Sequence, residues 1–462
     1  MATSTVYGSN MDDANWLKHE VGRHAFHPMA DPKDTVGNPP PIIMKGDGVY
    51  VTDLDGRRML DCQGGLWCVN AGYGREEIIQ AITDQLRELP YYTNFPGSAN
   101  APSIRLSAKL CELTAQEGMA SVLFGSGGSD ATETAFKMAR QYWKLVGEPE
   151  RLKFLSLRNG YHGLHFGGMS ACGGDAWRRS YEPLVPGFIN VESPNLYRPP
   201  FEGVDPETLA DMCANLLERE ILFQSPDTIA ALIAEPIQGA GGVHVPPANY
   251  WPRLREICDR YGILLIADEV ITGFGRSGEL FGVRNWGVKP DIMCVAKGIT
   301  SGYIPLGATL LNERVASAWE AQGPRSVVMH GYTYSGHPVA CAAGLVAVDI
   351  AVREDLAGNA ADVGSYLLAG LRRLMDRHEV IGDVRGKGLM IAVELVCDRT
   401  TKEAFGPTDP YPMAVSDKCL SNGVMLRTIV NKFIISPPLT LNRAQADDIV
   451  AALDDALAKT PR

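Results

Sequence analysis

The stretch Leu264-Leu-Ile-Ala-Asp-Glu-Val270 decides the fold, because a short apolar run ends there in an acidic pair. Similar runs, each followed by a glycine-containing loop and a more polar stretch, recur between about residues 121 and 311. This rhythm is typical of buried parallel strands that alternate with helices. The sequence therefore predicts an α/β domain whose functional residues lie at the carboxyl ends of its strands. We predict strands at residues 121–124, 154–157, 229–234, 263–267 and 292–296.

The regions on either side of this domain predict a second, smaller core. Residues 48–61 are typical of a hairpin, with Asp55-Gly56 as its tight turn. We expect residues 1–75 to join residues 338–462 in a small α+β domain, and residues 76–337 to form the large domain. In the C-terminal part we predict a helix over 339–352, a strand at 389–393 and a helix over 444–458.

Composition excludes several classes of function. The 462 residues include 54 acidic and 43 basic ones, a net charge of −11 that disfavours nucleic acid and anionic membranes as partners. Ten cysteines occur without a C-x-x-C pair, so we expect no metal site and a reducing compartment. The stretch Met1 to His19 lacks the features of a signal peptide, and residues 338–348 are far short of the ~20 needed to span a bilayer. These observations predict a soluble, cytoplasmic protein.

A phosphate cradle is predicted at Phe124-Gly-Ser-Gly-Gly-Ser-Asp130, between a strand and a helix. Backbone N–H groups at a helix N-terminus bind phosphate well. No Gly-Lys-Ser/Thr follows, and Asp130 occupies the sixth position of a G-x-G-x-x-G pattern, so the nucleotide-binding motifs are not matched. The alternative is that Ser129 or Asp130 only caps the helix.

Two charged residues end apolar strands and complete a chemical set. Asp268 needs a cationic partner if it is buried, unless it is merely a cap or turn carboxylate. Lys297, followed by Gly298, is placed to become a desolvated nucleophile towards aldehydes, unless it reaches the surface. A phosphate cradle, an acid for a ring nitrogen and a lysine for an aldehyde are the three requirements of pyridoxal phosphate.

These motifs resemble the class III, fold-type I, pyridoxal-phosphate-dependent aminotransferases, over about residues 41–439. The similarity is greatest to the omega-transaminases that use amines or omega-amino acids with pyruvate. The motifs that carry it are Gly65-Leu-Trp-Cys-Val-Asn-Ala-Gly-Tyr-Gly-Arg75, Tyr161-His-Gly163, Glu235-Pro-Ile-Gln-Gly-Ala-Gly-Gly242, Asp268-Glu-Val-Ile-Thr-Gly-Phe-Gly-Arg276 and His330-Gly-Tyr-Thr-Tyr-Ser-Gly-His-Pro338.

The resemblance implies a large domain built on a mostly parallel seven-stranded sheet flanked by helices, and a smaller α+β domain drawn from both termini. It makes Lys297 the lysine that forms a Schiff base with the cofactor and Asp268 the partner of the pyridine nitrogen. The cofactor site that it implies comprises Ser126, Gly127, Gly128, Ser129, Tyr161, His162, Glu235, Asp268, Val270, Ile271, Lys297 and, reaching the phosphate of a neighbouring subunit, Thr333.

For the substrate, the resemblance implies Trp67, Tyr161 and Tyr92 (or Tyr91) as pocket walls and Arg427 as a mobile carboxylate-binding arginine. Taken singly, these aromatic residues could equally be core residues, and the arginine a surface ion pair. The family further implies a homodimer or a dimer of dimers with shared active sites, an amine donor and a keto-acid acceptor.

Two departures refine this interpretation. Ile271 stands where many members that use gamma-amino acids or ornithine have Gln, which favours the amine and omega-amino acid branch. The phosphate loop has a glycine in place of one serine hydroxyl. We predict a ping-pong transamination through Lys297, with pyruvate as the expected acceptor. The alternatives are another pyridoxal-phosphate reaction, such as racemisation or decarboxylation, or a non-catalytic binding protein.

Overall fold

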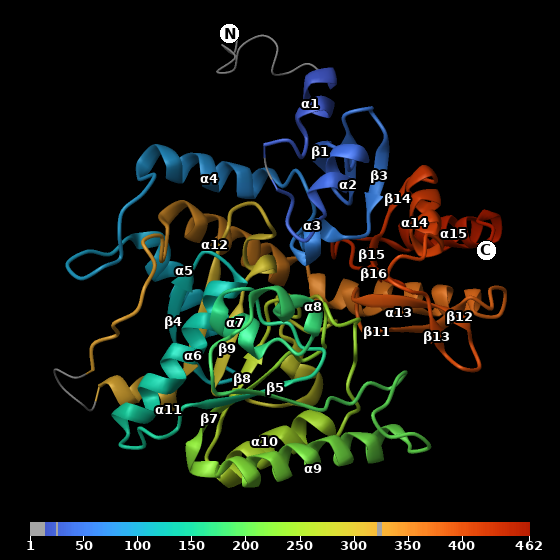
Figure 1. Cartoon of the computed structure of the whole chain (residues 1–462). Coiled ribbons are helices and arrows are strands. Elements are labelled where there is room, and N and C mark those ends of the chain that lie inside the picture. Colours follow the sequence, from blue (N-terminus) through green and yellow to red (C-terminus); the bar gives the residue numbers. More distant parts are fainter. Residues whose placement is uncertain (1–13, 25, 321–325) are drawn as a thin grey trace.

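A seven-stranded sheet forms the centre of the computed structural model, which describes residues 14–24, 26–320 and 326–462 (Figure 1). Neighbouring strands pair in parallel except at β10, which runs antiparallel to both of its neighbours. The predicted mostly parallel seven-stranded sheet is confirmed, with β6 and β10 added to the five strands expected. In sheet order the strands are β4 (Met119–Gly125), β10 (Gly307–Asn312), β9 (Ile292–Val295), β8 (Leu264–Asp268), β7 (Ile229–Ala234), β5 (Lys153–Leu157) and β6 (Phe188–Val191).

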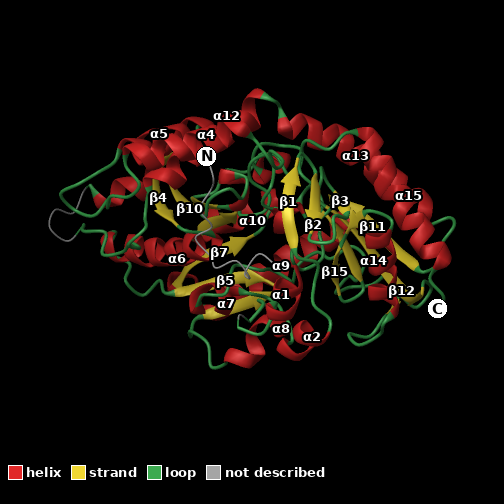
Figure 2. Ribbon diagram, turned by 90° about the horizontal axis from the view of Figure 1, so that it is seen from above, coloured by secondary structure: helices red, strands yellow, loops and turns green. Residues whose placement is uncertain are grey.

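Helices cover both faces of this sheet, because successive side chains of a strand point to opposite faces. Ile266 of β8 packs in the cluster that includes α6, whereas its neighbour Leu265 packs in the cluster of α9 and α10. Figure 2 shows α5 and α12 on one side of the sheet and α6 and α7 on the other. The helices are α6 (Gly128–Leu145) and α7 (Phe166–Ala171) on the first face, and α5 (Ala101–Leu113), α9 (Pro206–Gln224), α10 (Tyr250–Tyr261) and α12 (Pro338–Arg353) on the second.

A second sheet joins the two ends of the chain. Its β3 pairs in parallel with β14, with Leu60 opposite Val424, so the N-terminal hairpin shares a sheet with the C-terminal region. The boundaries expected at residues 75 and 337 stay predictions, and α12 contributes side chains to the cores on both sides of the second boundary. The strands of this sheet are β1 (Ile43–Asp47), β2 (Tyr50–Asp53), β3 (Arg58–Asp61) and β14 (Val424–Met425).

A third sheet is built from strands of the C-terminal region, and β15 lies at one of its edges. Its core is a cluster of buried, mostly aliphatic residues that also includes the N-terminal Leu60. The strands are β11 (Ile381–Gly386), β12 (Ile391–Asp398), β16 (Lys432–Ile435) and β15 (Arg427–Ile429), with β13 (Glu403–Ala404) paired to β12. The helices packed around this region are α13 (Leu356–Leu374), α14 (Tyr411–Ser421) and α15 (Arg443–Lys459).

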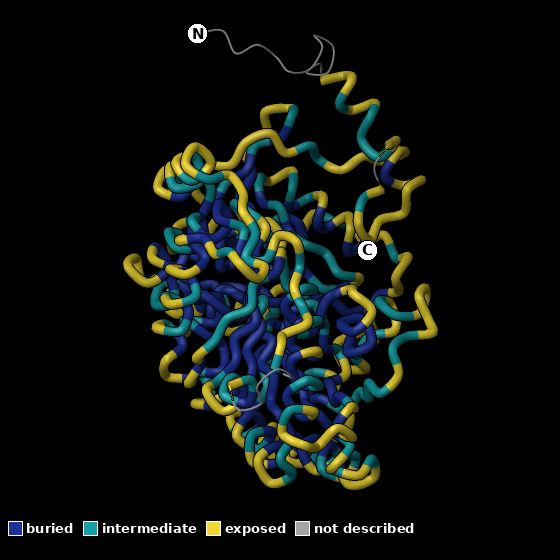
Figure 3. Tube along the Cα trace, turned by 90° about the vertical axis from the view of Figure 1, so that its left-hand side faces the viewer, coloured by how far each residue is buried: buried dark blue, intermediate teal, exposed yellow. Residues whose placement is uncertain are grey.

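The remaining helices are mostly short and lie in connections. They are α1 (Ala14–Glu20), α2 (Pro32–Gly37), α3 (Gly64–Trp67), α4 (Glu76–Glu88), α8 (Asp175–Arg178) and α11 (Glu313–Ala316). Of the stretch Met1 to His19, the first thirteen residues lie outside the described part of the chain. Burial is greatest along the central strands (Figure 3). No helix in the described residues is long and apolar enough to cross a bilayer.

Candidate active site

A cavity of about 900 Å³ opens at the carboxyl ends of five of the parallel strands. Residues that directly follow β4, β7 and β9 line it, as do Tyr161 in the loop after β5 and Asp268, the last residue of β8. Ligands of open α/β sheets bind at this edge. The sequence-predicted residues that line the cavity are Trp67, Ser126, Gly127, Gly128, Ser129, Tyr161, His162, Glu235, Asp268, Val270, Ile271, Lys297 and Arg427.

Thr333 and Tyr92 do not line this cavity. Thr333 is exposed, and Tyr92 has 54% of its surface accessible. The neighbouring Tyr91 donates its hydroxyl hydrogen to the carbonyl oxygen of Thr333 at 2.7 Å, so these residues form one surface region. Their roles stay predictions: Thr333 was expected to reach the phosphate of a neighbouring subunit, and Tyr92 (or Tyr91) to form a wall of the substrate pocket.

The predicted phosphate cradle is the N-terminus of α6. No side chain caps its first turn, so the alternative in which Ser129 or Asp130 merely caps the helix finds no support. The Asp130 carboxylate instead accepts a hydrogen bond from the Ser126 amide, at 2.6 Å. A Cβ at Gly128 would lie 2.7 Å from the Val270 side chain, so only glycine fits there. Unpaired helix N–H groups beside a glycine-lined cavity fit a phosphate group.

Asp268 lies on the cavity wall with a buried histidine behind it. The His162 Nδ1 is 2.8 Å from Asp268 Oδ2, and both side chains are almost completely inaccessible. The Val270 amide donates to the other carboxylate oxygen at 3.1 Å. The His162 Nε2 has no hydrogen-bond partner among the described residues, so the Nδ1–H tautomer is the one that this network favours. The imidazole thereby orients a carboxylate that can hold a protonated ring nitrogen.

Lys297 follows β9 after one intervening residue and lines the same cavity. Its backbone has a φ of 45°, which is strained for a residue with a side chain and is typical of functional sites. Burial lowers the pKa of its amine below the ordinary lysine value, against the opposing charge of Asp268 and other neighbours. A larger fraction of Lys297 is therefore neutral and nucleophilic near pH 7 than of a free lysine.

Glu235 follows β7 and organises the opposite wall. Its two carboxylate oxygens accept hydrogen bonds from the amides of Tyr161 and Gly239, both at 2.8 Å. Burial raises the pKa of Glu235 to about 7. The carboxyl group thus fixes the backbone of Tyr161, whose ring lies edge-on to Trp177 at 5.1 Å. A planar cofactor would fit between the Tyr161 ring and the Val270 side chain, which both line the cavity.

Residues 64–67 form a left-handed turn that carries one wall of the cavity. The φ angles are 54° at Gly64 and Gly65, and 69° at Leu66 and Trp67. This conformation costs about 1–2 kcal/mol for each residue with a side chain. Leu66, Trp67 and Cys68 all line the cavity. The Trp67 ring also packs in a small buried cluster, so the core and pocket interpretations of this residue both hold.

Arg427, in β15, reaches the cavity from the third sheet. Its guanidinium makes no ion pair with a carboxylate of the described residues, so its charge is available to a ligand. Burial lowers its pKa below the ordinary arginine value.

Sequence reasoning missed other lining residues because they carry no recognisable pattern. They include Pro28, Met29, Trp177 and the loop that follows Lys297.

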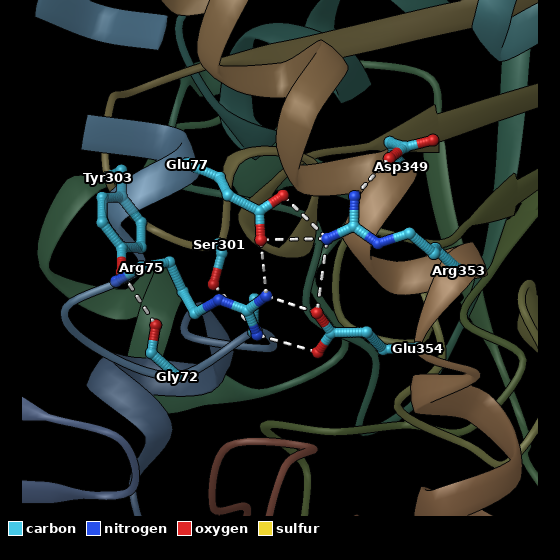
Figure 4. Close-up of polar contacts among 9 residues, drawn as sticks. Gly72, Arg75, Glu77, Ser301, Tyr303, Asp349, Arg353 and Glu354 are labelled. Carbon is cyan, nitrogen blue, oxygen red and sulfur yellow. Dashed lines mark hydrogen bonds and ion pairs between the residues drawn. The ribbon is translucent and has the colours of Figure 1, made fainter. Parts of the chain in front are cut away.

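That loop is held from behind by residues 71–75 (Figure 4). The Tyr303 hydroxyl accepts a hydrogen bond from the Arg75 amide at 2.6 Å and donates one to the Gly72 carbonyl oxygen at 3.0 Å. The Ala71 amide donates to the Ser301 hydroxyl at 2.9 Å. Thr300, Gly302 and Ile304, which alternate with these anchored residues, line the cavity. The segment after Lys297 is therefore fixed to the segment after Trp67.

Comparison with known proteins agrees with this geometry. The family model of the class III aminotransferases matches residues 33–457. The putrescine–pyruvate aminotransferase of Pseudomonas aeruginosa is 41% identical over 95% of this chain and 94% of its own. The taurine–pyruvate aminotransferase of Bilophila wadsworthia is 39% identical over 90% of this chain and 92% of its own.

Solved structures extend the same result to three dimensions. An amine transaminase from an uncultivated Pseudomonas species, in its pyridoxal-phosphate-bound form, has 54% identity and a TM-score of 0.92, covering 95% of this chain and 99% of its own. A thermostable (S)-enantioselective omega-transaminase from Thermomicrobium roseum has 42% identity and a TM-score of 0.93, covering 97% and 99%.

Racemase, decarboxylase and binding-protein alternatives find no support in these relatives. The cavity also fits pyridoxal phosphate, because an uncapped helix N-terminus, a buried carboxylate and a desolvated lysine converge there. The chain belongs to the class III aminotransferases, the pyridoxal-phosphate enzymes that transfer an amino group from an amine donor to a keto acid.

Proposed function

We propose that this enzyme transfers the amino group of a primary amine or an omega-amino acid to pyruvate, in two half-reactions at one site. The observation that carries the proposal is the convergence of Lys297, Asp268 and the N-terminus of α6 on one cavity. Relatives that act on putrescine and taurine with pyruvate support the choice of acceptor.

The roles of the residues follow from their positions. Pyridoxal phosphate, when bound, supplies an electron-withdrawing ring that stabilises negative charge at the substrate carbon. The α6 N-terminus holds the phosphate, and Asp268, oriented by His162, keeps the ring nitrogen protonated. The Lys297 amine would hold the cofactor through its aldehyde, and its Nζ, when free, would accept the proton from the donor carbon. Its lowered pKa suits it to accept that proton.

Substrate selection is assigned to the outer part of the cavity. Arg427 binds the carboxylate of pyruvate or of an omega-amino acid, since a guanidinium pairs with a carboxylate through two parallel hydrogen bonds. Trp67 and Ile271 present an apolar wall to the rest of the donor. The lining contains no acidic residue besides Glu235 and Asp268 in the described part of the chain, so a second ammonium group would find no counter-charge near Arg427.

Assembly and location follow from residues outside the cavity. We propose a homodimer or a dimer of dimers in which Thr333 and Tyr92 complete the site of the neighbouring subunit, which would explain their exposure here. The division into a small domain (residues 1–75 and 338–462) and a large domain (76–337) is part of the same proposal. All ten cysteines are free thiols, which supports a reducing, cytoplasmic location.

The test is the visible absorption of the loaded enzyme in the presence of an amine donor without a keto acid. We expect the donor to bleach the band of the bound cofactor, and pyruvate to restore it. The Lys297→Ala variant should lose steady-state turnover, because the proton at the donor carbon then has no acceptor. Lys153→Ala, which changes a lysine bonded to Gln224 at the other end of the sheet, is the matched control and should keep its activity. Wild-type turnover by Lys297→Ala would overturn the assignment.

A further inference from the structure

The left-handed turn at residues 64–67 needs stabilising contacts from outside the turn, because its backbone conformation is unfavourable for Leu66 and Trp67. Its support is Asp61, the last residue of β3. One oxygen of this carboxylate accepts hydrogen bonds from the amides of Gln63 at 2.8 Å and Gly64 at 3.1 Å. The other accepts from the Gly65 amide at 2.9 Å.

A fourth donor completes the shell around this carboxylate. The Tyr73 hydroxyl donates to Asp61 Oδ2 at 2.7 Å, and burial together with the nearby negative charge raises the Tyr73 pKa well above its ordinary value. Asp61 is 3% exposed and forms no ion pair in the described residues. A buried carboxylate without a cation is stabilised by several N–H and O–H donors, which makes these bonds strong and their loss costly.

The turn gains a fixed position from its other contacts. The Ser436 amide donates to the Cys62 carbonyl oxygen at 2.7 Å, and a Cβ at Gly64 would lie 2.4 Å from the Ser436 carbonyl oxygen. The turn is therefore pressed against the end of β16, with no space for another residue type at Gly64. The side chains that leave this turn are those of the cavity wall, Leu66, Trp67 and Cys68.

We propose that Asp61 is a positioning residue of the active site, which holds the strained turn so that Trp67 forms the substrate wall. The inference rests on the proposed function, in that it takes Trp67 as a contact of the amine donor. Asp61 touches neither the cavity nor Lys297, so it acts on donor binding and donor preference through Trp67 and leaves the proton-transfer residues in place.

The Asp61→Asn substitution tests the proposal. An amide has the same shape as the carboxylate, but its NH2 group would face N–H or O–H donors that now bind a carboxylate oxygen. We expect the KM for the amine donor to rise about tenfold or more, as for the loss of hydrogen bonds to a charged group, with a much smaller change in kcat. Amide hydrogen exchange should accelerate in the peptide that contains residues 62–68. This second measurement needs no activity, so it separates a failure of the positioning role from a failure of the proposed function.

A double-mutant cycle distinguishes positioning from general stability. If Asp61 acts through Trp67, adding Asp61→Asn to Trp67→Ala should raise the KM no further than Trp67→Ala alone. The matched control is Asp53→Asn, which also changes a carboxylate that is 3% exposed and holds the neighbouring Asp55-Gly56 turn, but away from the cavity. Asp53→Asn should leave the KM unchanged. Additive effects of Asp61→Asn and Trp67→Ala, or an unchanged KM or exchange rate in Asp61→Asn, would overturn the proposal.

Discussion

At the residue scale, two almost equally buried aspartates lie at opposite ends of the large sheet. One serves the active site, and the other stabilises the fold. Asp268 is 4% exposed at the carboxyl end and lines the cavity. Asp291 is 5% exposed before β9, where it accepts hydrogen bonds from Arg255 at 3.0 Å and Arg314 at 2.7 Å. The first carboxylate has a histidine and a ligand site beside it, whereas the second is already paired with two cations.

The same substitution should therefore have opposite consequences at the two positions. Asp268→Asn should lower the rate of the amine half-reaction by about 10²- to 10³-fold, the usual loss when one electrostatic contact to developing charge is removed. Asp291→Asn should keep the rate but lower the free energy of unfolding by about 3 kcal/mol, because it leaves buried charge unpaired. Stopped-flow absorbance and urea unfolding measure the two effects. Equal half-reaction rates for the two variants would contradict the assignment of Asp268.

At the scale of elements, the sequence predicts those strands that are apolar throughout, such as β8 and β9, but it does not predict strand direction. Residues 307–312 of β10 are almost as buried as the parallel strands, yet β10 runs the other way, because direction depends on the connection and not on composition. Contacts between distant elements cannot be predicted from the sequence either. His162 contacts Asp268, 106 residues away in the chain, and Tyr303 contacts Arg75, 228 residues away. Asp268 and Lys297 could be predicted from their strand ends, and the family resemblance placed His162 in the same site. The hydrogen bond by which His162 orients Asp268 could not be predicted.

The junction behind the cavity joins such distant elements through two kinds of contact (Figure 4). The Arg75 guanidinium bonds Glu354 at the end of α12 at 2.8 Å, and Arg353 bonds Glu77 of α4 at 2.7 Å, at half-exposed positions. Tyr303 instead joins two loops through its half-buried hydroxyl. Exposed ion pairs contribute little to stability, whereas a lost hydroxyl leaves a backbone donor and acceptor unpaired.

Tyr303→Phe should therefore destabilise the enzyme by about 1 kcal/mol, the usual net contribution of a hydrogen bond. Arg353→Gln should produce a smaller decrease in the thermal midpoint, and the difference between the two variants should persist at high salt, where ion pairs are screened. Differential scanning calorimetry at two salt concentrations measures both. A larger loss of stability in Arg353→Gln than in Tyr303→Phe would contradict the view that the hydroxyl contributes more than the exposed ion pairs.

At the scale of the whole molecule, one buried cation links the two ends of the chain to the large sheet. Arg276 is fully inaccessible, and burial lowers its pKa to about 10. Its guanidinium donates to the Asn70 side chain at 2.8 Å and to the carbonyl oxygens of Leu389 and Pro437. The segment after the turn that carries Trp67, the loop that follows Asp268 and two segments of the C-terminal region are therefore joined through one side chain.

Thr333 and Tyr92 lie outside the cavity of their own chain, and Thr333 makes the assembly testable. If Thr333 completes the partner's site, Thr333→Trp and Lys297→Ala should each be inactive as homodimers but complement each other when mixed. Random pairing makes half of the dimers mixed, and each mixed dimer has one intact site of two, so about one quarter of the wild-type activity should return. Mixing Lys297→Ala with Asp268→Asn is the control: both residues line the cavity of the same chain, so each site of a mixed dimer retains one defect and no activity should return. Full activity of Thr333→Trp alone, or a mixture with Lys297→Ala that stays inactive after subunit exchange is shown by mass spectrometry, would exclude a site shared through Thr333.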